Sequence, residues 1–359
     1  MDAPSPGYPP SATPIQYVPV PAPPPRRSGW GLLFTLAILA VLGMSLLLNF
    51  GLLGAVGMSV EGRTLTEKHH SLSRTALDKI ALIRVEGTIL EGDGFVKEQI
   101  DQVRDDDRVK AIVLRVDSPG GTVTGSDFIY HHLRELAEAK KVPIVVSMGS
   151  LAASGGYYVS MAVGDTPKSI YAEPTTWTGS IGVIIPHYNV AGLMQEWKIQ
   201  SDSISSHPLK GMGSITKEMT PEERAIFQGL VDESFTRFKQ IIAAGRPGFR
   251  GDDGQAKLDK LATGQVFTSD QAKANGLIDE VGFVEAAISR AVELAGADEA
   301  SIRVVKYERP VSLVDVLIGG QAQARSFDAT ALLNLATPKA YYLTTLLPAV
   351  LTTQPGRAH

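Results

Sequence analysis

The feature that most restricts the fold of this chain is an uncharged apolar segment near its amino terminus. No charged residue occurs between residues 28 and 60, and the part from Trp30 to Phe50 has about the 20 apolar residues that a helix needs to cross a bilayer. The apolar core of a cleaved signal peptide is shorter, about 7 to 15 residues, and this segment also follows a long tail. We therefore expect a transmembrane anchor at residues 28–57.

The charges on either side of this segment predict its orientation. Arg26 and Arg27 precede it, whereas Glu61, Arg63 and Lys68 after it are of mixed sign. The positive-inside rule then keeps the amino end cytoplasmic and places the rest of the chain on the other side of the membrane. Residues 1–27 are rich in proline, which favours extended polyproline structure and a disordered tail.

Beyond a polar linker at residues 58–76, apolar runs alternate with amphipathic helical patterns. Strands are expected at KIALIRVEG from Lys79, KAIVLRVDS from Lys110 and VPIVVSMGS from Val142, and helices at residues 95–103, 126–139, 154–163 and 220–244. Continuous Val, Ile and Leu runs between helices favour an α/β domain with a parallel sheet, here at residues 77–300. The extension at residues 301–359 contains an apolar stretch that Pro348 interrupts, so we expect it to pack on the domain or on the membrane surface.

Composition excludes several classes of function. A net charge of -4 with mixed signs gives no basic surface for a nucleic acid. The chain contains no cysteine, which removes thiol nucleophiles, disulfides and thiolate metal sites. It also shows neither a P-loop nor a histidine-rich ligand set, so we expect no metal and no nucleotide cofactor.

Two strand ends carry residues suited to chemistry. The strand from Lys110 runs into Pro119, Gly120 and Gly121, a turn whose backbone N–H groups can point at a carbonyl oxygen. The strand from Val142 runs into Ser154 and Gly155 at the start of a helix, a position that exposes a serine at the edge of a sheet. By this local pattern alone, Ser154 is equally well explained as a helix cap.

A serine hydroxyl needs a base to act as a nucleophile. His187 and His207 fall in no triad pattern, and His131 and His132 lie in a polar helix where we expect them to be solvated. Lys210 lies in a glycine-bearing loop with few charged neighbours, where desolvation would favour the neutral amine. An isolated lysine is usually a surface residue, so the residues themselves leave the base open.

Several motifs together resemble a known peptidase family. They are DSPGG at Asp117, GSLAASGGYY at Gly149, TGSIG at Thr178, a lysine in the loop before EMTPEE, and GQVFTSDQAKANGLIDEVG at Gly264. Their order and spacing, over Lys79 to Gly296, closely resemble the short form of signal peptide peptidase A, family S49. This resemblance implies a ClpP/crotonase-like parallel-sheet superhelical core, here preceded by one transmembrane helix. One departure is Gln265, where the family often has arginine, which affects a structural ion pair but not the dyad.

The resemblance also implies roles for individual residues. Ser154 would be the nucleophile, Lys210 the general base, and Ser180 the residue that orients the lysine, while Gly120, Gly121 and Gly155 would form the oxyanion hole. The family builds its sites between neighbouring protomers, which implies a homo-oligomeric ring. It further implies peptide substrates, such as remnant signal peptides and other unfolded apolar segments, at a bacterial inner (cytoplasmic) membrane.

Three alternatives stay open at this point. A ClpP-like protease would pair Ser154 with His187. A crotonase-like acyl-CoA enzyme would use the glycine-rich oxyanion hole without a serine nucleophile, although CoA is cytoplasmic and the domain is expected outside. A non-catalytic scaffold would result if Ser154 and Lys210 never meet.

Overall fold

The computed structural model describes residues 29–60, 65–310 and 340–343. The chain divides into two compact units, Met1–Glu61 and Gly62–His359. The expected proline-rich tail at residues 1–27 lies outside the described residues.

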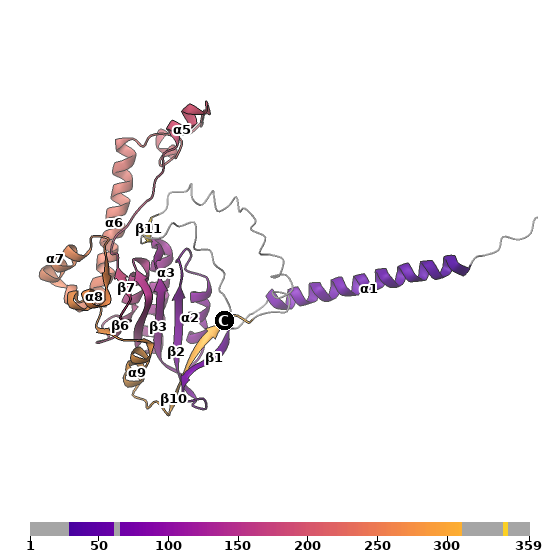
Figure 1. Ribbon diagram of the computed structural model, residues 1–359, viewed down its shortest axis with the longest axis horizontal. Coiled ribbons are helices and arrows are strands. Elements are labelled where there is room, and N and C mark those ends of the chain that lie inside the picture. Colours follow the sequence, from indigo (N-terminus) through magenta and orange to yellow (C-terminus); the bar gives the residue numbers. More distant parts are fainter. Residues whose placement is uncertain (1–28, 61–64, 311–339, 344–359) are drawn as a thin grey trace, which may run out of the picture. The chain divides into compact units, whose positions relative to one another are not determined.

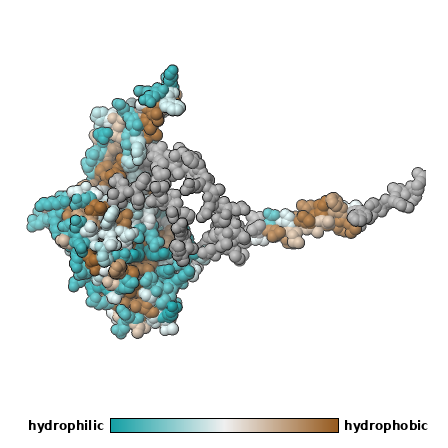
Figure 2. All heavy atoms as spheres, in the orientation of Figure 1, coloured by the Kyte–Doolittle hydropathy of each residue, from teal (hydrophilic) through white to brown (hydrophobic). Residues whose placement is uncertain are grey.

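The first unit contains one long helix, α1 (Gly29–Val60). Its segment Leu33–Gly51 is the only one among the described residues that is long and apolar enough to cross a membrane. Large apolar side chains such as Phe34, Leu42 and Phe50 are exposed along it, and Figure 2 shows this apolar surface in brown. The helix begins at Gly29 and ends at Val60, so it covers nearly all of the expected segment at 28–57 and continues for three residues beyond it.

The second unit is built on a mostly parallel sheet (Figure 1). The strand order is β1-β10-β2-β3-β5-β6-β9, with β7 paired to β5 and β8 to β7. The strands are β1 (Thr66–Leu72), β2 (Asp78–Glu86), β3 (Val109–Ser118), β5 (Ile144–Ala153), β6 (Ile170–Ala172), β7 (Trp177–Gly179), β8 (Val266–Thr268), β9 (Glu280–Val281) and β10 (Ile302–Glu308). A short second sheet joins β4 (Gly120–Thr122) to β11 (Tyr341–Leu343).

Helices cover both faces of the main sheet, which explains why its strands are continuous apolar runs. Alternate residues of β2 point to opposite sides: Ala81 and Ile83 pack in the larger core and Ile80 and Leu82 in the smaller one. The larger core takes residues from α2 (Phe95–Arg104), α3 (Val123–Lys140), α4 (Gly155–Ser160), η1 (Met161–Val163), α6 (Pro221–Gly245), η3 (Pro247–Phe249), α7 (Gly251–Leu261) and α8 (Ser269–Asn275). The smaller core is closed by α9 (Val284–Leu294).

The sheet begins earlier and ends later than the expected domain limits of 77 and 300. β1 lies in the expected linker and pairs antiparallel with β10, which lies in the expected extension and pairs parallel with β2. A buried ion pair fixes this edge, since the Lys79 ammonium lies 2.7 Å from Glu67 Oε1 and 2.5 Å from Asp106 Oδ2. The expected packing of the carboxyl-terminal extension on the domain is found for the four described residues 340–343.

The long helix α6 begins as expected with a capping box. The Thr220 hydroxyl accepts a hydrogen bond from the Glu223 amide, and the Glu223 carboxylate accepts one from the Thr220 amide. The preceding residues include α5 (Ala191–Glu196) and η2 (Pro208–Gly211). Figure 1 shows α5 beyond the amino-terminal end of α6, away from the sheet.

Candidate active site

The end of β5 is displaced from its neighbour β3 by a bulge. Val116 pairs with Met148 but Ser118 pairs with Ala152, so β5 carries extra residues between these two positions. The Asp117 carboxylate holds the bulge by accepting hydrogen bonds from the Ser150 hydroxyl (2.7 Å) and the Leu151 amide (3.1 Å). Before the bulge β5 pairs with β6, and after it β5 pairs with β7, so the bulge marks the point where the strand changes its neighbour. Asp117 was given no role from the sequence, although an acid two residues before a Pro-Gly-Gly turn is a usable signal.

Ser154 follows β5 in a strained conformation. Its φ of 54° and ψ of -114° lie in a region that non-glycine residues rarely adopt, and the residue is 1% exposed. Such strain costs about 1 to 3 kcal/mol and occurs preferentially at functional sites. The Ser154 side chain makes no capping hydrogen bond to α4. The alternative that Ser154 is merely a helix cap is therefore wrong.

Ser180 lies next to Ser154 because β7 pairs with β5. Ala153 is opposite Gly179, and the Ser154 amide donates to the Gly179 carbonyl oxygen at 2.7 Å. Ser180 follows directly, also with a positive φ (51°) and also buried. Its amide donates to the Gln265 carbonyl oxygen at 2.7 Å. This contact uses the backbone of Gln265, so any side chain at position 265 can provide it.

The three glycines expected at an oxyanion hole come together beside Ser154. A Cβ on Gly120 would lie 2.6 Å from the Gly155 nitrogen, and a Cβ on Gly155 would lie 3.1 Å from the Gly121 nitrogen. Gly120 also has a φ of +97°, so two requirements exclude a side chain there. The Gly155 amide is at the first position of α4, where helix N–H groups have no partner within the helix. This arrangement can donate hydrogen bonds to a carbonyl oxygen at Ser154.

Lys210 is not part of this cluster in the described chain. It lies in η2 and is exposed, and its amine makes no hydrogen bond or ion pair with any described residue. Its segment belongs to an arm formed by residues 185–219, which includes α5 and η2. Within this arm, the Val190 amide donates to the Ile215 carbonyl oxygen (2.8 Å), and His187 Nε2 lies 3.4 Å from the Ser214 carbonyl oxygen. The structure therefore brings Ser154, Ser180 and the glycines together, and it leaves both Lys210 and His187 on the arm.

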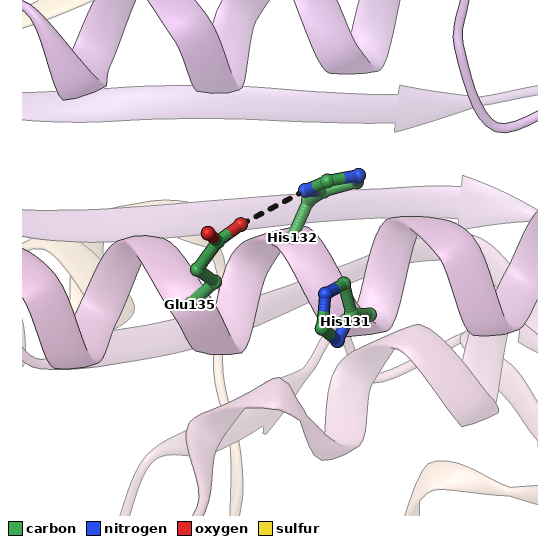
Figure 3. A group of neighbouring side chains, drawn as sticks. All are labelled: His131, His132 and Glu135. Atoms are coloured by element: carbon green, nitrogen blue, oxygen red, sulfur yellow. Dashed lines mark hydrogen bonds and ion pairs between the residues drawn. The ribbon is translucent and has the colours of Figure 1, made fainter.

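A histidine cluster on α3 is a separate surface feature (Figure 3). Ligand-type atoms of His131, His132 and Glu135 all lie within 4.8 Å of one another. His131 is exposed as expected, whereas His132, also expected to be solvated, is partly buried. His132 Nδ1 lies 3.1 Å from Glu135, and the Arg104 guanidinium also pairs with Glu135 at 3.3 Å. The hydrogen bond from His132 and the charge of Arg104 lower the pKa of Glu135. A cation bound here would have to compete with Arg104 for the same carboxylate.

Comparison with known proteins adds the family. The sequence model of Peptidase family S49 matches residues 136–298, which include Ser154, Ser180 and Lys210. A putative protease of Synechocystis sp. is 36% identical over 248 residues, which are 69% of this chain and 86% of that protein. The chain belongs to peptidase family S49. It is thus a serine peptidase with a ClpP-like fold, which confirms the family and fold class expected from the motifs.

Other S49 relatives match over shorter shares of their length. Protease 4 of Salmonella typhi is 39% identical over 225 residues, 60% of this chain but 34% of its own length. A putative signal peptide peptidase SppA of Enterococcus faecium is 35% identical over 192 residues, 53% of this chain and 52% of that protein. This S49 chain therefore spans only about a third of Protease 4 and half of the Enterococcus protein.

Proposed function

We propose that the chain is a membrane-anchored serine endopeptidase in which Ser154 is the nucleophile and Lys210 the general base. The observation that carries the proposal is the state of Ser154 in the structure. This serine has a strained backbone, its side chain does not cap the helix, and it lies beside Ser180 and three glycines. Preorganised backbone donors at such a turn stabilise a developing oxyanion, an effect of about 3 to 4 kcal/mol for one donor.

In the proposed mechanism, a peptide lies extended over the cleft and a neutral Lys210 removes the Ser154 proton. The alkoxide attacks the scissile carbonyl, and amides of the Gly120, Gly121 and Gly155 cluster hold the oxyanion. The C–N bond then breaks, the protonated lysine gives its proton to the leaving amine, and an acyl ester stays on Ser154. Water, whose proton the lysine removes, hydrolyses this ester and restores the Ser154 hydroxyl. Ser180 accepts a hydrogen bond from the lysine and orients it. Desolvation of the lysine on assembly favours its neutral form.

We further propose that Lys210 comes from a neighbouring protomer in a homo-oligomeric ring. The exposed position of Lys210 on the arm supports this arrangement, since its amine has no partner among the described residues. A groove of about 460 Å³, lined by residues 180–184, part of α6 and residues 262–264, opens beside Ser180 and gives an incoming side chain a path.

The anchor and the substrates belong to the same proposal. We assign residues 1–27 to a cytoplasmic tail, α1 to a single membrane span, and the second unit to an extracytoplasmic peptidase domain at a bacterial inner membrane. Support comes from the apolar length of α1 and from the name of the Enterococcus relative. Remnant signal peptides and other unfolded apolar peptides are the substrates that such an anchor would keep close.

The test is peptidase activity of the detergent-solubilised protein on an unfolded apolar peptide. Ser154→Ala and Lys210→Ala should each lower kcat by about a thousandfold or more, with unchanged circular dichroism. Oligomers assembled from a mixture of these two inactive variants should regain activity, because some interfaces then combine an intact Ser154 with an intact Lys210.

Four results would contradict the proposal, in whole or in part. Near-full activity of Lys210→Ala would remove the lysine as base, and loss of activity in His187→Ala would favour the Ser/His alternative. Full loss in both single variants without any recovery in mixed oligomers would keep the dyad but place both residues in one chain. Binding of an acyl-CoA without covalent labelling of Ser154 by a serine-directed phosphonate would favour the crotonase-like alternative.

A further inference from the structure

Two histidines and a glutamate come together on the surface of α3. His131 and His132 are adjacent in the chain, and Glu135 follows four and three residues later, so the helix places it beside both. One ligand-type atom of each residue lies within 4.8 Å of those of the other two. Figure 3 shows the Glu135 carboxylate turned toward the His132 ring. In the part of the chain that the structure describes, no other three histidines or acids come together in this way.

The spacing of these atoms suits a small metal ion. His132 Nδ1 lies 3.1 Å from Glu135 Oε2. Zinc binds imidazole nitrogen and carboxylate oxygen at about 2.0 to 2.2 Å in tetrahedral geometry, which places two neighbouring ligand atoms about 3.3 Å apart. An ion can therefore replace the proton between His132 and Glu135 with little movement of either side chain. His131 is exposed, so its ring can turn toward the same ion.

The His132 ring is held in place by packing. It is partly buried and lies edge-on to the ring of Phe128, with the two centroids 4.3 Å apart. Phe128 in turn packs closely on the loop before α2, where a Cβ on Gly92 would lie 2.4 Å from the phenyl ring. A side chain that packing already fixes loses little further freedom when it binds a ligand, which favours binding.

The Glu135 carboxylate is ionised, and one of its oxygens is available. The hydrogen bond from His132 is the main cause that lowers the pKa of Glu135, so the group is negative at neutral pH. Arg104 and His132 both approach Oε2, whereas Oε1 makes no hydrogen bond or ion pair with any described residue. Arg104 has a second acid, Asp101, at 3.1 Å. A cation can therefore displace Arg104 from Glu135 without leaving the arginine unpaired.

A cavity of about 530 Å³ opens beside two of these residues. Its lining includes His131 and Glu135, together with two further acids, Glu138 and Asp165. Each of these two further acids is paired with an arginine. Water in the cavity can reach an ion held by His131 and Glu135, which would complete the four ligands that zinc takes in sites with three protein ligands.

We propose that His131, His132 and Glu135 bind a divalent transition-metal ion of the zinc type. Two imidazoles and one carboxylate suit Zn²⁺, whereas magnesium and calcium prefer sites made of oxygen alone. From the sequence we expected no metal, because the chain has no histidine-rich ligand set; the third ligand emerges only when α3 brings Glu135 beside the histidines. The ion has no part in the proposed peptide hydrolysis, so this inference is independent of the Ser154 site.

Calorimetric titration with Zn²⁺ tests the site in the full chain, solubilised in detergent and without an added histidine tag. We expect saturable binding of one Zn²⁺ per chain and no binding of Mg²⁺. His131→Ala, His132→Ala and Glu135→Gln should each weaken Zn²⁺ binding by at least about tenfold, because each removes one of three protein ligands. Arg104→Gln should instead tighten it by about three- to tenfold, because a competing positive charge is removed.

His69 and His70 provide a matched control. They are also adjacent histidines, but they lie in β1 and belong to no group of three ligand-type residues in the described chain. His69→Ala/His70→Ala removes two imidazoles elsewhere and should bind Zn²⁺ within about twofold of the unchanged protein, since distant sites act independently. Ser154→Ala should also bind Zn²⁺ normally, so failure of the peptidase proposal would leave this test intact.

Three outcomes would overturn the proposed site. They are the absence of saturable Zn²⁺ binding, binding that the three ligand variants leave unchanged, and binding that the His69→Ala/His70→Ala control weakens as much as they do. The Arg104→Gln variant keeps the test sharp if a ligand variant proves unstable, because a folding defect cannot raise the affinity for Zn²⁺. Unchanged or weaker binding in Arg104→Gln would contradict the competition at Glu135 on which the geometry rests.

Discussion

The contact between Gly155 and Ser126 offers a sharp test of the glycine cluster. A Cβ on Gly155 would lie 2.4 Å from the Ser126 hydroxyl oxygen and 3.1 Å from both Gly120 Cα and the Gly121 nitrogen. Gly155 starts α4 without a positive φ, so Gly155→Ala carries no backbone penalty, and steric conflict is its main effect. The 2.4 Å contact is far too short, and something must move.

The expected magnitude follows from what can move. Ser126 donates to the Thr122 carbonyl oxygen at 2.9 Å, so turning its hydroxyl away costs about 1 kcal/mol. An added methyl group in a packed site costs about 1 to 3 kcal/mol in all. If Gly155 shifts instead, its amide leaves the proposed oxyanion position, and losing one such donor lowers kcat by about 10²- to 10³-fold. We expect a kcat loss of this order together with a drop in Tm of about 2 to 8 °C.

The assay combines kcat on an unfolded peptide with thermal unfolding of the same samples. Gly155→Ala/Ser126→Ala should regain most of the lost kcat because the 2.4 Å contact is gone, whereas Ser126→Ala alone should stay near wild type in kcat. Gly229→Ala in α6 is a matched control, since a Cβ there meets no atom within 4 Å. A kcat for Gly155→Ala within about threefold of wild type, or no recovery in the double variant, would refute the assigned geometry.

Three further predictions concern stability. Lys79→Met leaves the Glu67 and Asp106 carboxylates without their buried partner, which should lower the free energy of unfolding by about 3 to 5 kcal/mol in a urea titration. A decrease below about 1 kcal/mol would show that β1 adds little to the stability of the domain. Burial raises the pKa of Asp106, but its hydrogen bonds, chiefly that from Lys79, outweigh burial and lower the pKa overall. The stability that ionised Asp106 contributes is therefore complete above its ordinary pKa of 3.8 and is lost as the pH falls below that value. In Lys79→Met, the fall of stability at acid pH should be less steep. Thr220→Ala removes half of the capping box at Glu223 and should lower Tm by about 2 to 4 °C, and Thr220→Ser should retain most of it.

The sequence predicted the parallel core because its signals are local. Strands expected from Lys79, Lys110 and Val142 begin within two residues of those positions, since each is a continuous apolar run buried on both faces. The position of Ser154 between a strand and a helix was equally predictable, but its strained conformation was not, since a serine at a helix start is equally typical of a cap. The capping box at Thr220 shows the same locality.

The edge strands could not be predicted in this way. β1 is polar, with only partly buried residues, and it gains its place by pairing with β10, more than 230 residues later in the chain. β11 has only three residues, and its partner β4 is a glycine turn without an apolar pattern. Pairings of this kind depend on tertiary contacts, and no periodicity within a short window carries them.

The proposed chemistry uses residues from two parts of the fold, the central sheet and the arm. Ser154 and Ser180 lie at the ends of paired strands, so folding of the sheet alone fixes their distance from each other. Lys210 lies in a short 3-10 helix on an arm, held by contacts to other arm residues, so folding of the described domain does not bring it to Ser154. A lysine amine must be neutral to act as a general base, and removal from water favours the neutral form. In the proposed ring, a second protomer would supply both the position of the lysine and its desolvation, so assembly would complete a site whose proposed nucleophile is already held by the sheet.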